Sequence, residues 1–142
     1  MTEVAFIALG SNLGDRAQHL HNARRSLGSL PESRVLAASG IDETEPLGGL
    51  AQPPYLNQMV ALETTLEPRA LLAALKAIER AEGRTSQERW ASRTLDLDIV
   101  RYGDREIHET ELHIPHPGIA SRDFWRRELG DLQAQLGASA PP

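Results

Sequence analysis

Apolar positions along the first hundred residues form two kinds of segment. Four runs are apolar or alternating and are bounded by Gly, Pro or polar residues, which predicts β-strands at residues 4–10, 34–41, 55–64 and 93–103. Between them, apolar residues recur at spacings of three and four, which predicts two amphipathic helices. The pattern therefore indicates a mixed domain of strands and helices.

The two helices carry recognisable signals at their ends. Asp15, followed three residues later by Gln18, predicts a capping box at the start of the first helix, and Pro31 closes that segment. Pro68 suits the first turn of the second helix, and Gly83 suits its C-terminal end. Each helix would present one apolar face to a sheet.

The predicted order is strand, helix, strand, strand, helix, strand. This order is typical of the ferredoxin-like βαββαβ fold of the α+β class, in which helices pack on an antiparallel sheet. A turn at Gly103–Asp104 leads into a short fifth strand at 105–109, and a final helix carries Leu129, Leu132 and Leu136. We expect this extra C-terminal hairpin and helix to cover the other face or an edge of the sheet, which gives three layers, α-β-α.

Three segments between these elements are polar or rich in Pro and Gly, at residues 42–54, 84–92 and 114–119. The first is expected to be a long loop, and loops of that length in a compact domain are usually functional or disordered. Residues 137–142 are expected to form a frayed tail.

Composition narrows the class of protein. The 142 residues suit a single domain spanning 1–142, and the absence of Cys excludes disulfides and thiolate metal sites. A net charge of −5 disfavours a nucleic-acid partner, which would select basic residues. The longest apolar run is too short to span a membrane, and the N-terminus lacks a signal peptide, so we expect a soluble, cytoplasmic protein.

The fourth predicted strand holds two carboxylates, Asp96 and Asp98, among apolar residues. Because side chains alternate along a strand, the two aspartates share one face while Leu95, Leu97 and Ile99 share the other. Their backbone positions are roughly 6.5–7 Å apart, from the rise per residue. Two carboxylates so placed repel unless cations lie between them, and a pair of Mg²⁺ ions fits that gap. The alternative is a strand with one solvated face.

Basic residues surround this acidic pair in the sequence. Arg84, Arg89 and Arg93 come just before it, and His116 follows in a Pro-flanked loop. Metal-holding carboxylates with charge-neutralising arginines are typical of phosphoryl transfer. The arginines could equally form a solvated basic loop, and His116 an ordinary loop histidine.

At this point four blocks of sequence resemble a known family, that of 6-hydroxymethyl-7,8-dihydropterin pyrophosphokinase. Together with their spacing they cover most of residues 4–124, and the block at 88–104, with its Arg-Thr-Leu-Asp-Leu-Asp, is the most specific. The four blocks are "ALGSNLGDR" (8–16), "TEPLGGLAQPPYLNQMVALET" (44–64), "ERWASRTLDLDIVRYGD" (88–104) and "LHIPHPGIASRDF" (112–124).

The resemblance implies a ferredoxin-like fold and transfer of pyrophosphate from ATP to the pterin hydroxymethyl oxygen, with AMP released, in folate biosynthesis. It implies that Asp96 and Asp98 hold two Mg²⁺ ions and that Arg84 and Arg93 are catalytic, stabilising charge on the phosphates. The polar segment 84–92 would be a lid that excludes water. Two small molecules, ATP and the pterin, would be the partners, and a monomer is the simplest expectation.

The same resemblance assigns residues to the two substrates. The pterin-binding residues it implies are Thr44, Pro46, Leu47, Tyr55, Asn57, Trp90 and Phe124. The ATP-binding residues it implies are Glu79, Arg84, Trp90, Arg93, Ile99, His116 and Arg122.

These assignments agree with the chemistry of the ligands. A flat heteroaromatic ring suits aromatic faces such as Tyr55 and Phe124, and an amide such as Asn57 offers both a donor and an acceptor. The ordinary alternatives are core packing for the two aromatics and a solvent-facing strand position for Asn57.

Some positions depart from the family pattern. Residues 85–87 lack the second lid arginine, and the usual apolar segment after Phe124 is replaced by "WRRELGDLQAQLG" (125–137). Three hypotheses follow: an active pterin pyrophosphokinase, a divergent pterin- and nucleotide-binding relative with weak or altered activity, or a ferredoxin-like RNA-binding module. The third needs a basic face and strand aromatics, which the acidic composition disfavours.

Overall fold

The computed structural model describes residues 2–45, 53–83 and 94–139. It contains strands and helices in the order β1 (Glu3–Ser11), α1 (Arg16–Gly28), β2 (Ser33–Ala38), β3 (Asp42–Thr44), β4 (Tyr55–Thr64), α2 (Pro68–Ala81), β5 (Asp96–Tyr102), β6 (Ile107–Glu109), β7 (Leu112–Ile114), the 3₁₀ helix η1 (Pro117–Ala120) and α3 (Asp123–Ser139). Within this described part, no helix is long and apolar enough to cross a membrane.

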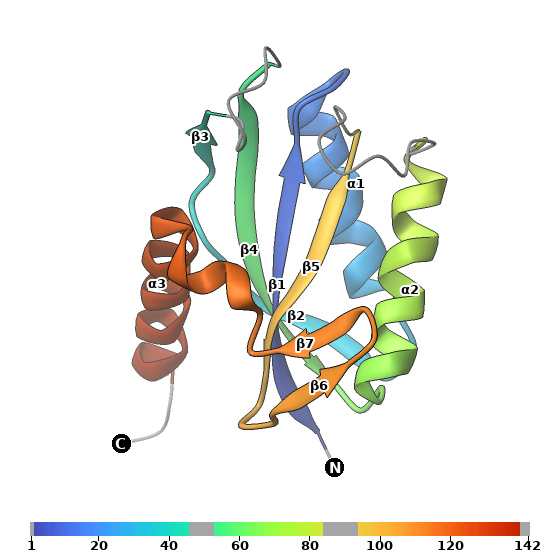
Figure 1. Cartoon of the computed structure of the whole chain (residues 1–142), viewed down its shortest axis with the longest axis vertical. Helices are drawn as coiled ribbons and strands as arrows, with labels where there is room; N and C mark the ends of the chain where they lie inside the picture. Colours follow the sequence, from blue (N-terminus) through green and yellow to red (C-terminus); the bar gives the residue numbers. More distant parts are fainter. Residues whose placement is uncertain (1, 46–52, 84–93, 140–142) are drawn as a thin grey trace.

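The main sheet is antiparallel, with strand order β2-β4-β1-β5 and with β3 also paired to β4 (Figure 1). The mixed α and β class is therefore as predicted. The long strands β1 and β4 are central because their apolar runs are buried on both faces, which only an inner strand allows.

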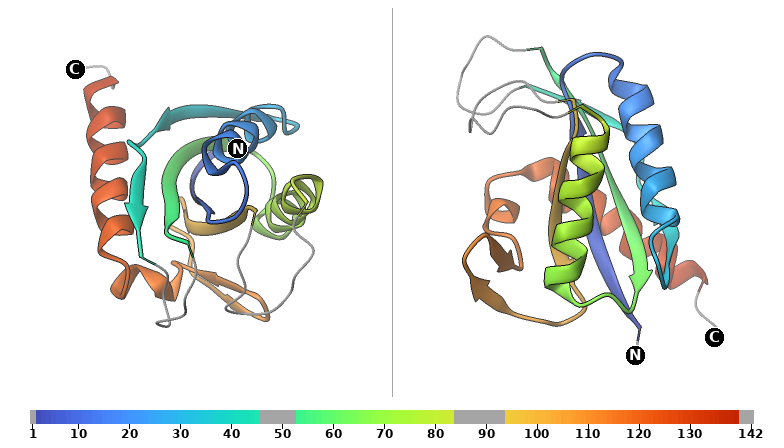
Figure 2. Two further views of the ribbon diagram at one scale, coloured as in Figure 1. Left: turned by 90° about the horizontal axis from the view of Figure 1, so that it is seen from above. Right: turned by 90° about the vertical axis from the view of Figure 1, so that its right-hand side faces the viewer.

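The two faces of the sheet are covered by different helices (Figure 2). Helices α1 and α2 pack on one face over alternate strand residues such as Ile7, Leu62 and Ile99. Helix α3 packs on the opposite face over Phe6 and Met59, which belong to the other alternation. We call this second face the α3 face. The period of two along each strand thus decides which layer a side chain enters.

Local signals at the helix ends are mostly confirmed. Asp15 caps α1 by accepting a hydrogen bond from the Gln18 backbone N–H at 3.1 Å. The Gln18 side chain, however, donates to Asn22 rather than completing a capping box. Pro68 begins α2 as predicted, and Gly83 follows its end at φ +87°, where a residue without Cβ is favoured.

The segment predicted as a loop at 42–54 contains a strand instead, because Asp42–Thr44 is β3. Acidic residues are poor strand formers in isolation. Here the edge of β4 supplies backbone partners, and Arg16 of α1 forms an ion pair with Glu43 at 3.1 Å. Tertiary context therefore overrides local propensity.

The C-terminal part also differs in detail from the prediction. The residues expected as a fifth strand at 105–109 supply β6, which pairs with β7 in a separate two-stranded sheet. Helix α3 continues to Ser139, so residues 137–139 are helical.

Candidate active site

A row of residues on the α3 face crosses three neighbouring strands, from Asn57 of β4 through Gly10 of β1 to Asp96 of β5, and we call it the polar row. Gly10 of β1 lies between Asn57 of β4 and Asp96 of β5, because it pairs with both. Residues paired directly across antiparallel strands share a face, and neighbouring strands are about 4.8 Å apart. Asn57 and Asp96 therefore lie on one face, separated by roughly two strand spacings, or about 10 Å.

Asp98 lies two residues after Asp96 on β5 and therefore on the same face. It pairs with Ala8, which belongs to the apolar cluster under α3, while the intervening Leu97 is only 5% exposed in the opposite core. Burial of Leu97 and Ile99 fixes the strand's orientation, so both carboxylates must project from the α3 face. The shared face of Asp96 and Asp98 is therefore as predicted.

His116 approaches this acidic pair from the segment before η1. Its Nε2 lies 3.6 Å from Asp98 Oδ1, and its backbone N–H donates to Val100 of β5. The Gly118 N–H donates to His116 Nδ1 at 2.8 Å, so a neutral ring carries its proton on Nε2, toward Asp98. His116 is thus oriented as a donor at the edge of the acidic pair.

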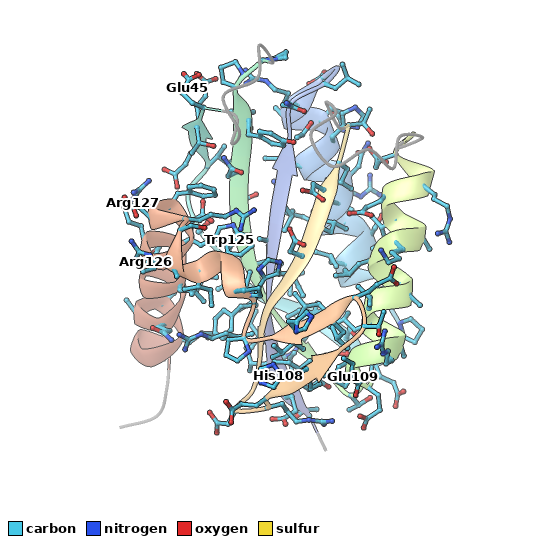
Figure 3. The ribbon with its side chains drawn as sticks, viewed as in Figure 1. Glu45, His108, Glu109, Trp125, Arg126 and Arg127 are labelled. Atoms are coloured by element: carbon cyan, nitrogen blue, oxygen red, sulfur yellow. The ribbon has the colours of Figure 1, made fainter. Side chains whose placement is uncertain are left out.

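Trp125 links His116 to Arg122. Trp125 meets the ring edge-on, with centroids 4.9 Å apart and an interplanar angle of 88°. The Arg122 guanidinium lies over Trp125, 4.6 Å from the ring centroid. In Figure 3, Trp125 lies on the side of α3 that faces the strands. Arg122 and His116, both predicted on the nucleotide side, are therefore brought together around one indole.

The other end of the polar row combines an aromatic ring and an amide. Asn57 is 6% exposed, and its Nδ2 donates to Thr44 Oγ1 at 2.6 Å, which fixes the direction of the amide. Tyr55 lies close by, because a Cβ built on Gly10 would be 3.3 Å from both Tyr55 Cδ1 and Asn57 Oδ1. Thr44, Tyr55 and Asn57 thus form one cluster beside Gly10, which has no side chain.

Glu79 and Ile99 lie in the layer behind the α3 face. Glu79 of α2 is 6% exposed and accepts a hydrogen bond from the Leu97 N–H, between the two aspartates, at 2.7 Å. The Ile99 side chain is buried against α1 and α2. The predicted ATP contact of Ile99 would therefore have to use its backbone.

Phe124 lies at the start of α3, partly buried, with its ring centroid 6.4 Å from that of Trp125. Five other predicted site residues lie outside the described part of the chain: Pro46, Leu47, Arg84, Trp90 and Arg93. Their roles stay predictions.

Sequence reasoning missed four contributors to this region. Gly10 and Gly118 have no Cβ, which leaves room for the side chains beside them. Trp125 contacts both His116 and Arg122. Glu128 is 3% exposed at one helical turn from Phe124, and burial, with Asp42 beside it, raises its pKa to about 9. An acidic residue at an otherwise apolar helix position, four after Phe124, was the available signal for Glu128.

The residues present are compatible with Mg²⁺. No group of three or more His, Cys, Asp or Glu in the described ranges could hold a metal ion by itself. Mg²⁺ typically binds one or two carboxylates and completes its shell with water and substrate phosphates. Asp96 and Asp98 on one face, with the Asp98 side chain 35% exposed, provide such a partial set.

Comparison with known proteins shows the family of this chain. Residues 6–134 match the model of the 7,8-dihydro-6-hydroxymethylpterin-pyrophosphokinase family. The chain belongs to this family. Three proteins named 2-amino-4-hydroxy-6-hydroxymethyldihydropteridine pyrophosphokinase are similar to it along nearly its whole length. That of Pseudomonas aeruginosa is 39% identical over 96% of this chain and 84% of its own. That of Haemophilus influenzae is 41% identical over 93% of this chain and 82% of its own. That of Bacillus subtilis is 38% identical over 99% of this chain and 84% of its own.

A pterin pyrophosphokinase has to hold a flat heterocycle and a polyphosphate side by side. In this chain the Tyr55–Asn57 cluster and the Asp96–Asp98 pair lie on one face of one sheet.

Proposed function

We propose that this protein transfers the pyrophosphoryl group of ATP to 6-hydroxymethyl-7,8-dihydropterin, giving the pterin diphosphate and AMP in folate biosynthesis. The observation that carries the proposal is the placement of Asn57, Gly10 and Asp96 in one row across three strands. The row joins a site suited to a pterin ring and a site suited to metal-bound phosphates.

In the proposed reaction, the pterin hydroxyl oxygen forms a bond to the β-phosphorus of ATP. The bond from that phosphorus to the bridging oxygen of AMP breaks, and the hydroxyl proton leaves to solvent. Such transfers need little covalent participation from the protein, so positioning and electrostatics dominate. Mg²⁺, when bound at Asp96 and Asp98, would neutralise the triphosphate charge.

The described residues have separate tasks in this scheme. Tyr55 and Phe124 would flank the pterin ring, and Asn57, fixed by Thr44, would pair with its hydrogen-bonding edge. A buried amide left unpaired is costly, so Asn57 would discriminate between ring systems. His116, with its Nε2 proton directed toward Asp98, would donate to a phosphate oxygen placed beside that carboxylate.

Residues outside the described ranges complete the proposal. Arg84 and Arg93 would take up charge on the phosphates, Trp90 would close over both substrates, and Pro46 and Leu47 would line the pterin pocket. Glu79 and Arg122 would serve the nucleotide side, Glu79 indirectly through the backbone of β5.

We class the domain as ferredoxin-like, with the β6–β7 hairpin and α3 as additions, and the strand order β2-β4-β1-β5 supports this class. A cytoplasmic monomer acting on two small molecules remains the expectation.

The test is to incubate the protein with Mg²⁺, ATP and 6-hydroxymethyl-7,8-dihydropterin and to identify the nucleotide product. We expect AMP rather than ADP. Asp96→Asn and Asp98→Asn should each lower the rate by about a hundredfold or more, because phosphate charge is no longer neutralised. Asp104→Asn, at an exposed turn position, is the matched control and should leave the rate unchanged.

The assay distinguishes an active enzyme from a divergent relative that only binds the substrates. Pterin binding without AMP formation would support the divergent relative and overturn the catalytic proposal. Binding of neither substrate would overturn both.

A further inference from the structure

Two carboxyl groups meet where α3 packs against β3. Glu128 of α3 and Asp42 of β3 line a cavity of about 210 Å³ between these elements. The remaining lining residues of this cavity are Ser39, Gly40, Arg127 and Asp131. Figure 3 shows Arg127 on α3 at this side of the molecule.

Glu128 is buried in an arrangement that requires a proton. It is 3% exposed, and neither of its oxygens accepts a hydrogen bond from a donor in the described residues. The carboxyl group of Asp42 lines the same cavity, and hydrogen bonding between the two carboxyl groups is among the causes that raise the pKa of Glu128. Two carboxylates are both acceptors, so they can form a hydrogen bond only when one of them is protonated.

The charges around Glu128 come from two elements. Asp42 of β3 and Asp131 of α3 favour its neutral form, and Arg127 of α3 opposes them. Ser39 and Gly40, which precede β3, add no charge. Burial is the largest cause of the raised pKa, at about 9, so Glu128 is the protonated partner at neutral pH.

This carboxyl pair lies beside the Thr44–Tyr55–Asn57 cluster, on the same face of the sheet. Asp42 is the strand partner of Asn57, and Thr44, two residues further along β3, accepts the Asn57 hydrogen bond. On α3, Phe124 precedes Glu128 by one turn, so the two share a side of the helix. The pair therefore joins the two elements that carry Thr44 and Phe124.

We propose that Glu128 is a positioning residue for the pterin pocket: its carboxylic acid donates a hydrogen bond to Asp42, which holds β3 against α3 and keeps Thr44, Asn57 and Phe124 in place around the ring. The proposal rests on the proposed function for the identity of the ligand. Ionisation of Glu128 replaces the hydrogen bond with repulsion between two carboxylates, and the cavity beside them lets water enter. Pterin affinity should therefore fall as Glu128 loses its proton.

The test measures the dissociation constant for 6-hydroxymethyl-7,8-dihydropterin from about pH 7 to about pH 10 for the full chain, Glu128→Gln and Asp42→Asn. Each amide supplies an N–H to the opposite carboxyl group at every pH. The ratio of wild-type to variant constants removes the titration of the pterin itself. We expect wild-type binding to weaken about three- to tenfold relative to Glu128→Gln over this range, which corresponds to losing one buried hydrogen bond.

A second measurement follows the carboxyl group without ligand. The ¹³C resonance that disappears in Glu128→Gln identifies the Glu128 carboxyl, and its titration should shift to lower pH in Asp42→Asn. Because the two variants lie on different elements, one remains usable if the other does not fold.

Each outcome decides a separate point. A flat affinity ratio, with Glu128 still titrating at high pH, overturns the positioning role and leaves the carboxyl pair intact. An ionised Glu128 at neutral pH overturns the pair itself. Absence of pterin binding by the wild type at neutral pH overturns the proposed function and the positioning role with it, whereas the resonance still decides whether the pair exists.

Discussion

At the scale of single residues, the proposed pterin pocket depends on the absence of a side chain at Gly10. Gly10 lies on the floor of the cluster, and a Cβ there would be 3.3 Å from Asn57 Oδ1 and from the Tyr55 ring. Asn57 cannot retreat freely, because Thr44 holds its side chain and the residue is nearly buried.

Gly10→Ala should therefore weaken pterin binding by about tenfold while leaving ATP binding close to that of the wild type, since overpacking at a tight site costs about 1–3 kcal/mol. Calorimetric titration with each ligand measures both effects. Gly130→Ala is the matched control, because a Cβ there meets nothing within 4 Å. Equal pterin affinities for the two variants would contradict a role for the space above Gly10.

Sequence alone predicted the shared face of Asp96 and Asp98 because alternation along a strand is a local property. It could not place Gly10 between Asn57 and Asp96, because that neighbourhood depends on the register of three strands that lie far apart in the sequence. The Asp42–Glu128 pair was out of reach for the same reason: it forms only after α3 docks on β3.

At the scale of elements, α2 fixes the backbone of the edge strand β5 through a hydrogen bond. The Glu79 carboxylate accepts the Leu97 N–H and so anchors the backbone between the two aspartates, away from the face on which they project. A buried strand N–H without a partner would cost about 1–3 kcal/mol.

Glu79→Ala should lower the free energy of unfolding by about 1–3 kcal/mol, the cost of leaving that N–H unpaired. Glu79→Gln should lose less, because its side-chain oxygen still accepts the same hydrogen bond. Urea unfolding followed by tryptophan fluorescence measures both variants. A Gln variant as unstable as the Ala variant would show that charge, rather than the acceptor, is what Glu79 contributes.

The elements themselves were predicted well where the chain is apolar and poorly where it is polar. β1, β4 and both early helices follow directly from hydrophobic pattern and end signals. β3 was missed because Asp42–Thr44 has no apolar residue, and its pairing comes from the exposed edge of β4.

At the scale of the whole molecule, the proton on Glu128 links stability to pH. The pKa of Glu128 is raised from an ordinary value near 4.5 to about 9 in the folded state. Between these values the folded protein holds a proton that the unfolded chain releases. The contribution of Glu128 to stability is therefore complete below the ordinary pKa and is lost as pH rises toward 9.

Glu128→Gln should accordingly gain stability relative to the wild type as pH increases through this window, with a slope of up to about 1.4 kcal/mol per pH unit for one proton. Chemical unfolding at several pH values measures the difference between the two proteins. Parallel curves for the two proteins would contradict a buried, protonated Glu128.

The last helix of the described chain has a consequence for how the protein is made. Strand β5, which ends at Tyr102, leaves the ribosome before α3, which ends at Ser139, so the strands can pair before α3 is available to pack on them. During that interval, roughly 2–7 s at ordinary synthesis rates, the nascent sheet has nothing over Phe6, Ala8 and Met59, which α3 later covers. A chaperone that shields apolar surface would have its target there until synthesis reaches the end of the helix.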